Sequence, residues 1–274
     1  MLRKMYKKLK AVLLADSKLL CDRKERNLIN KPFEFRGTNG RAILLIHGWT
    51  STPYEVRKLG KYLNENGFTV SAPLLRGHGT VPKDLEKVKW TDWIKDITIA
   101  YNKLKKDYSQ VYVIGTSLGA NLAVILAKNK PSVSGLVLMA MPYKIRIERT
   151  MVLLAKLMSL FEKYNKKFYP PTFGVSTTMT RVISYQTYPI SSAFEAFIPV
   201  KISRRILPKI TQPCLVIQSS SDHVVARKNL EQIYASLGSK IKEKKHIKRA
   251  YHTFISDSKN GRVFKDILDF INRN

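Results

Sequence analysis

Short runs of apolar residues alternate along the chain with longer segments in which apolar residues recur at helical spacing. The short runs predict buried strands at residues 42–46, 111–114, 133–139 and 214–218, and further short strands are expected at 69–72 and 243–247. The helical spacing predicts helices at residues 53–65, 90–107, 120–128 and 261–271. Because strands that alternate with helices form βαβ units, the pattern predicts an α/β fold: a mostly parallel sheet with helices on both faces.

The alternation of strands and helices stops between residues 142 and 213. This gap contains a strongly apolar helix candidate at residues 151–161 and many aromatic side chains. We interpret residues 143–205 as a small helical cap inserted into a domain that spans residues 37–274.

Residues 1–36 precede this domain and are interpreted as a basic N-terminal helical extension. Near its start, Leu2, Met5, Leu9 and Val12 recur at the spacing of one helical face, while lysine and arginine mostly occupy the other faces. A basic amphipathic helix of this kind can lie on an anionic bilayer or pack on the body of the protein. Residues 1–20 are therefore a candidate for peripheral contact with an anionic membrane.

The net charge of the chain is +29, from 49 lysines and arginines against 20 acidic residues. Such a surface attracts polyanions, whether nucleic acid or an anionic membrane. The lysines are spread along the whole chain rather than gathered in one basic tail, which is typical of solvated faces. We therefore expect no specific nucleic-acid partner.

The two cysteines, Cys21 and Cys214, do not make a disulfide framework, which suits a reducing compartment. No apolar run approaches the roughly 18 residues of a membrane-spanning helix. The apolar stretch at residues 11–15 is too short for a signal peptide. These features predict a cytoplasmic protein, for which residues 1–20 are the candidate peripheral contact with the membrane surface.

The segment with the clearest chemistry is Gly115-Thr-Ser117-Leu-Gly119, which has the form G-x-S-x-G. A predicted strand comes directly before it and a predicted helix directly after it. The turn between such a strand and helix is so sharp that the serine takes a strained conformation, and glycines on either side avoid collisions. Its hydroxyl is then exposed at a helix N-terminus, which favours negative charge. The context predicts that Ser117 is a nucleophile.

A serine hydroxyl needs a base, and the chain has five histidines. Proteins with this turn order their catalytic residues as serine, acid, histidine, which removes His47 and His78. His252 follows the last predicted strand, at the edge of the sheet where open α/β folds keep their sites. We favour His252 as the base over His246, which lies inside a predicted strand, and over His223.

The acid that orients this base is expected on the loop after the strand at 214–218. Asp222 lies on that loop, where it would hold the imidazole in the correct tautomer. Asp257 is the other nearby acid but follows the histidine. The backbone N–H groups of Leu118 and Trp49 are the expected oxyanion donors, because they belong to the residue after the nucleophile and to the loop after the first strand.

Other motif classes are missing from the sequence. It has no P-loop, no G-x-G-x-x-G and no spacing of cysteine or histidine that suggests zinc. His47 and His78 could meet in space, but two histidines do not make a metal site. No cofactor and no metal are expected.

Four motifs together resemble the bacterial carboxylesterase and monoacylglycerol lipase family: LIHGWTSTPYE at 45–55, APLLRGHG at 72–79, WTDW at 90–93 and IGTSLG at 114–119. The resemblance covers roughly residues 40–272 and is densest from 42 to 127. It implies an α/β-hydrolase fold with a small helical cap. It places a catalytic triad on Ser117, Asp222 and His252 and the oxyanion donors on Trp49 and Leu118.

The same resemblance implies a serine hydrolase that cleaves short- or medium-chain acyl esters or monoacylglycerols through an acyl-enzyme on Ser117. The expected partner is a small-molecule or lipid ester. Two alternatives are an acyl thioesterase, which uses the same triad, and a catalytically weak hydrolase-like scaffold that binds an anionic membrane. The sequence indicates no oligomeric state.

Overall fold

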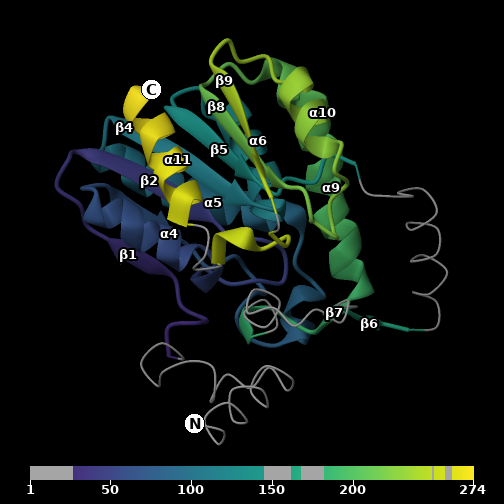
Figure 1. The fold of residues 1–274 in the computed structure, drawn as a ribbon. Coiled ribbons are helices and arrows are strands. Elements are labelled where there is room, and N and C mark those ends of the chain that lie inside the picture. Colours follow the sequence, from purple (N-terminus) through teal and green to yellow (C-terminus); the bar gives the residue numbers. More distant parts are fainter. Residues whose placement is uncertain (1–26, 145–161, 168–181, 249, 257–260) are drawn as a thin grey trace, which may run out of the picture.

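The computed structural model describes residues 27–144, 162–167, 182–248, 250–256 and 261–274 of the chain. Their main feature is a seven-stranded sheet with the order β1-β3-β2-β4-β5-β8-β9 (Figure 1). The strands are β1 (Phe33–Phe35), β2 (Arg41–Ile46), β3 (Thr69–Ala72), β4 (Gln110–Thr116), β5 (Gly135–Met139), β8 (Cys214–Ser219) and β9 (Lys242–Ile247). Only β1 pairs antiparallel among the described strands of this sheet. The predicted α/β fold is confirmed.

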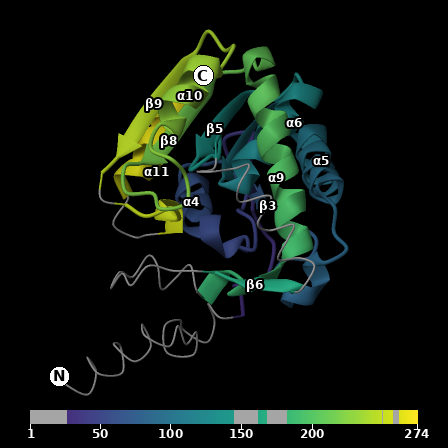
Figure 2. The ribbon, with the colours of Figure 1, turned by 90° about the vertical axis from the view of Figure 1, so that its right-hand side faces the viewer.

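Helices cover both faces of the sheet (Figures 1 and 2). One face carries α4 (Tyr54–Glu65) and α11 (Gly261–Arg273), and the other carries α5 (Trp90–Asp107), α6 (Leu118–Asn129), α9 (Ile190–Ile206) and α10 (Asn229–Ser236). Short 3-10 helices occur at Pro82–Leu85, Leu207–Lys209 and Phe254–Ser256.

Strand β2 shows why the central strands read as continuous apolar runs. Ala42, Leu44 and Ile46 face the core under α5 and α6. Ile43 and Leu45 face the core under α4 and α11. Successive side chains of a strand point to opposite faces, so a strand covered on both faces needs apolar residues at every position.

The apolar pattern of the sequence does not predict β1, which lies within the residues assigned to the N-terminal extension. Phe33 pairs with Ala72 and Phe35 with Val70 on β3. The Phe33 and Phe35 rings also stack on one another, 4.8 Å apart. A strand of three residues is too short to show a recognisable period, so the apolar pattern could not reveal it.

Part of the segment interpreted as a cap is described. It contains α9 and a small antiparallel sheet of β6 (Tyr164–Lys166) and β7 (Thr187–Pro189). Helix α9 lies beside α6 and α5 (Figure 2), and Asn121 on α6 donates a hydrogen bond of 2.8 Å to Ser203 on α9. The helix candidate at 151–161 lies outside the described residues, as do residues 1–26. No described helix has the length and apolar character needed to cross a bilayer.

Candidate active site

Ser117 occupies a strained turn between a central strand and a buried helix. Strand β4 ends at Thr116 and α6 begins at Leu118. Ser117 has φ 52° and ψ −121°, a conformation that residues with a side chain rarely adopt. Its backbone N–H donates to Met139 O at 2.8 Å, which ties the turn to the end of β5. Backbone strain of this kind persists only where the surroundings enforce it, and it gathers at functional sites.

The two flanking glycines are required by space. A Cβ atom on Gly115 would lie 2.2 Å from the carbonyl oxygen of Gly119. A Cβ on Gly119 would lie 2.3 Å from the carbonyl oxygen of Ile46, on the neighbouring strand. Real Cβ atoms do not come this close to backbone, so the close contact of β4, α6 and β2 allows only glycine at both positions.

Ser117, His252 and Asp222 form a continuous chain of hydrogen-bond contacts. His252 Nε2 lies 2.9 Å from Ser117 Oγ, and His252 Nδ1 lies 2.8 Å from Asp222 Oδ2. These residues follow β4, β9 and β8, whose carboxyl ends meet at one edge of the parallel sheet. The side chains of His252 and Asp222 are only 11% and 1% exposed. The structure thus brings together the three residues selected from the sequence.

The Asp222 carboxylate accepts hydrogen bonds at both oxygens. Oδ1 accepts from the backbone N–H groups of Val224 and Val225, at 2.8 and 2.9 Å. Oδ2 accepts from Gln218 Nε2 at 3.0 Å, in addition to its contact with His252. Burial raises the pKa of Asp222, but the charge and hydrogen bond of His252 and the N–H groups of Val224 and Val225 lower it by more, so the net pKa lies below its ordinary value. The carboxylate therefore stays ionised.

The pKa of His252 lies above its ordinary value of 6.5. Burial lowers it, but the charge of Asp222, its hydrogen bond and the charge of Glu55 raise it by more. The site is therefore built to stabilise an imidazolium. Such an arrangement can take the proton of Ser117 and hold it during a reaction.

The loop after β2 packs directly against the turn that holds Ser117. A Cβ on Gly48 would lie 3.3 Å from the Cβ of Ser117. The backbone N–H of Gly48 donates to Glu55 Oε2 at 2.8 Å, which ties the loop to the buried first turn of α4. Trp49 follows in this loop. The N–H of Leu118 is the first of α6, where it has no acceptor within the helix.

His47 and His78 have structural surroundings. His47 Nε2 accepts from the backbone N–H of Leu75 at 3.1 Å, and Nδ1 lies 2.9 Å from Gly48 O, where it donates in the neutral tautomer. Burial, then the nearby His78, lower the pKa of His47 to about 3. Burial likewise lowers the pKa of His78 to about 4. Both rings stay neutral and hold the loops together.

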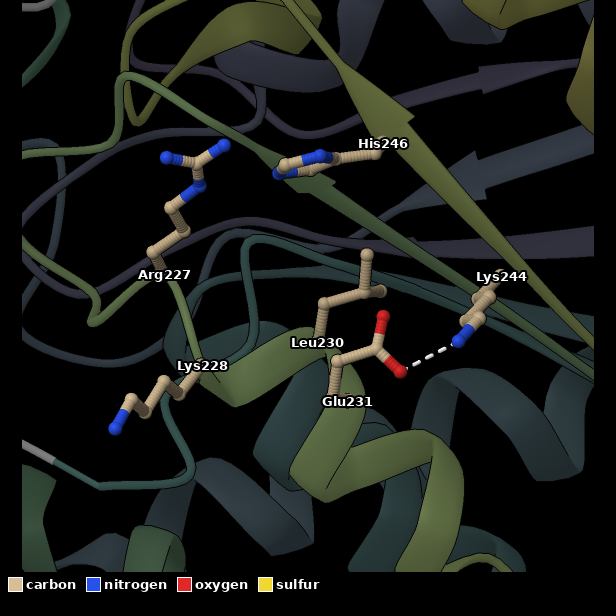
Figure 3. A pocket seen from close by; sticks show the side chains of 6 residues that line it. All are labelled: Arg227, Lys228, Leu230, Glu231, Lys244 and His246. Carbon is tan, nitrogen blue, oxygen red and sulfur yellow. Dashed lines mark hydrogen bonds and ion pairs between the residues drawn. The ribbon is translucent and has the colours of Figure 1, made fainter.

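The alternative bases lie elsewhere. His246 is exposed on β9 and lines a surface pocket of about 510 Å³ between β9 and α10 (Figure 3). Ser117, His252 and Asp222 are not among the residues that line this pocket. The His223 ring packs edge-on against Tyr251, with 6.3 Å between the ring centroids. Among the described residues, no cluster of histidine, cysteine and acidic side chains could hold a metal ion.

Sequence reasoning missed two residues that support this site. Gln218 is buried at the end of β8, and a polar residue inside an otherwise apolar strand was the available signal. Glu55 is buried in the first turn of α4, where an acidic residue usually serves only the helix dipole. The pKa of Glu55 lies above its ordinary value, because burial raises it by more than the Gly48 N–H and the charge of His252 lower it.

A parallel α/β sheet with a serine on a strained strand-to-helix turn, and a histidine and an aspartate on the loops beside it, defines a serine hydrolase of the α/β-hydrolase fold. The chain belongs to the family described as serine aminopeptidase, S33 (Hydrolase_4), whose model matches residues 37–189 and 193–259. Curated relatives and solved structures agree with this assignment.

The chain is 28% identical to a carboxylesterase of Bacillus subtilis (strain 168), over 89% of this chain and 96% of the relative. It is 27% identical to a thermostable monoacylglycerol lipase of Bacillus sp. (strain H-257), over 86% and 92% of the two chains. A solved structure described as LipS and LipT, two metagenome-derived lipolytic enzymes, has 25% identity and a TM-score of 0.81, and covers 89% of this chain and 98% of that one.

Proposed function

We propose that this protein is a serine hydrolase that cleaves carboxylic esters, with Ser117 as nucleophile, His252 as general base and Asp222 as the acid that orients it. The observation that carries the proposal is the contact chain from Ser117 Oγ through His252 to Asp222, on a turn strained to φ 52°. The similarity to a carboxylesterase and a monoacylglycerol lipase supports an ester substrate. Short- or medium-chain acyl esters and monoacylglycerols are the proposed substrate class.

In the first half of the reaction, Ser117 Oγ attacks the acyl carbon while His252 Nε2 accepts its proton. The carbonyl oxygen gains negative charge, and the backbone N–H groups of Trp49 and Leu118 are the proposed donors that stabilise it. His252 then gives its proton to the alkoxide leaving group as the ester C–O bond breaks. The products are a free alcohol and an acyl group bound to Ser117.

In the second half, water replaces the alcohol. His252 removes a proton from this water, which attacks the acyl carbon and forms a second tetrahedral intermediate. The bond to Ser117 Oγ breaks, and His252 returns the proton to the serine. Throughout, the buried Asp222 keeps Nδ1 of the imidazole protonated, because its Oδ2 accepts the Nδ1–H bond.

A fluorophosphonate probe tests this assignment, because it labels only an activated serine. We expect the natural protein to be labelled and to hydrolyse a monoacylglycerol and a p-nitrophenyl ester, while Ser117→Ala and His252→Ala lose both activities. The informative comparison is His252→Ala, which keeps the serine but removes its base. Labelling is measured by gel fluorescence and hydrolysis by released fatty acid or p-nitrophenol.

Ser221→Ala serves as the matched control, because Ser221 is an exposed serine on the same loop as Asp222. It should behave as the natural protein does. A folded natural protein that is neither labelled nor active on esters would contradict the proposed function, and so would undiminished labelling of Ser117→Ala.

We further propose that residues 1–20 bring the enzyme to an anionic membrane surface, where a lipid ester would be found. The support is their sequence pattern of apolar and basic positions, together with the net charge of +29. The full chain should co-sediment with vesicles that contain phosphatidylglycerol and a chain without residues 1–20 should not, while vesicles of phosphatidylcholine alone retain neither. Binding that survives the deletion unchanged would rule out this role.

A further inference from the structure

A lysine from the inserted segment reaches the loop that follows β2. Lys167 comes directly after β6, and its Nζ donates hydrogen bonds to Thr50 Oγ1 and, at 3.3 Å, to Ser184 Oγ. Burial lowers the pKa of Lys167 to about 8, although the charge of Glu55 opposes this effect. An ammonium group that is taken out of water keeps its position only where partners replace the lost hydration. Thr50 and Ser184 are its hydrogen-bond partners, and the charge of Glu55 favours the ammonium form.

The contact to Thr50 continues to Trp49. The Thr50 hydroxyl accepts from Lys167 and donates to the backbone carbonyl oxygen of Trp49 at 2.6 Å. Thr50 has φ 61°, which is an outlier for a β-branched residue. A conformation this unfavourable must be held in place by its surroundings. Lys167 therefore acts at the most strained residue of the loop, one position after the proposed oxyanion donor.

Two further residues of the inserted segment hold the same turn. The backbone N–H of Tyr185 donates to Thr50 O at 3.0 Å. The Trp49 indole N–H donates to Ser192 Oγ on α9 at 2.9 Å. From the core, the Glu55 carboxylate accepts from the N–H of Gly48. The short turn at residues 48–50 is thus fixed from both the core and the inserted segment.

We propose that Lys167 is a positioning residue for the turn at residues 48–50. Lys167 acts through the Thr50 hydroxyl and holds the backbone N–H of Trp49 toward the reacting carbonyl. This inference rests on the proposed ester hydrolysis. It assigns the inserted segment a role in the chemistry: the turn at residues 48–50 has its working geometry only when Lys167 contacts Thr50. Lys167 touches no reacting atom.

The first test compares Lys167→Met with Lys166→Met on a p-nitrophenyl ester. Lys166 is the adjacent, exposed residue of β6, so Lys166→Met is a matched control with the same charge change. We expect Lys167→Met to lower kcat roughly 10- to 100-fold, because an oxyanion donor acts in the transition state and a displacement of about 1 Å is costly. The KM should change by less than about threefold, since ground-state binding does not use this donor.

A double-mutant cycle tests the route through Thr50. Thr50→Val removes the hydroxyl at nearly constant shape, and Thr50→Ser keeps the hydroxyl and should retain more kcat than Thr50→Val. If Lys167 acts through Thr50, the double variant Lys167→Met/Thr50→Val should be no slower than the slower single variant. Fully additive losses would overturn the proposed route. Thermal unfolding confirms that each variant is folded, and the Thr50 pair alone decides the route if Lys167→Met does not fold.

The two proposals fail in different ways. If Ser117→Ala retains ester hydrolysis, the proposed function itself fails. If Ser117→Ala is inactive while Lys167→Met has the kcat of Lys166→Met, the function stands and the positioning role of Lys167 is wrong. A rise in KM without a fall in kcat would also overturn it, because that result would place Lys167 in substrate binding.

Discussion

Asp222→Asn is expected to lower kcat for ester hydrolysis on the order of 10⁴-fold, while the variant remains folded. In the natural protein, Oδ1 accepts from two backbone N–H groups and Oδ2 accepts from Gln218 and His252. An asparagine must place its NH₂ group at one of these two positions. In either orientation the NH₂ group faces other hydrogen-bond donors. The Nδ1–H of His252 therefore loses its acceptor, or the loop at residues 222–225 shifts.

The kinetic consequence lies in the tautomer of His252. Without an acceptor at Nδ1–H, the imidazole takes the tautomer with its proton on Nε2 and cannot accept the proton of Ser117. The pH profile gives a second readout. Base catalysis needs neutral His252, so activity of the natural protein should rise with pH through a pKa above 6.5, and this limb should move to lower pH in the variant.

The matched control for this experiment is Asp266→Asn. Asp266 forms a surface ion pair with Lys245 at 3.3 Å, and surface pairs contribute about 1 kcal/mol or less to stability. It should keep the natural kcat and pH profile. Wild-type kinetics in Asp222→Asn would mean that another group orients the base and would remove Asp222 from the triad.

Gly115→Ala is expected to have the second large effect. The added methyl group would lie 2.2 Å from the carbonyl oxygen of Gly119, and that atom is backbone within α6, which cannot rotate away. Strand β4 and α6 must separate, so we expect a stability loss of about 1–3 kcal/mol or more. The displaced Ser117 should also cost roughly 100-fold in kcat. Chemical denaturation and ester kinetics measure the two effects.

Gly261→Ala makes the same chemical change at a position with room for it. A Cβ on Gly261, the first residue of α11, meets no atom within 4 Å. Alanine is the better helix former, so this variant should keep its stability or gain a few tenths of a kcal/mol. If Gly115→Ala were as stable and active as Gly261→Ala, the close packing of β4 against α6 would not be what requires glycine.

The sequence predicted the parts of the fold whose signals are local. Strands β2, β4, β5 and β8 are largely apolar because both faces of the sheet are covered, and these strands and β3 appear in the structure within a few residues of their predicted positions. Ser117 could be selected because one short motif encodes its turn. His252 and Asp222 could be selected because chain order limits which loops reach that turn. Their roles in the chemistry are the proposal that the variants test.

What the sequence could not reveal depends on contacts between distant residues. Lys167 and Thr50 are 117 positions apart, and no periodicity in the inserted segment marks Lys167 among the other lysines. Glu55 has the sequence context of an ordinary first-turn acid, and only its burial against Gly48 shows another role. Both roles depend on tertiary packing, which local patterns do not specify.

The edge strand β9 has a consequence for how copies of this protein behave toward one another. It lies at the end of the sheet, and an open edge offers unpaired backbone groups to a strand of another molecule. Its sequence, Lys-Glu-Lys-Lys-His-Ile, places the exposed lysines Lys244 and Lys245 along that edge. Charged side chains on an edge strand disfavour its pairing with a strand of another molecule, so the lysine-rich composition of β9 protects the sheet against edge-to-edge aggregation.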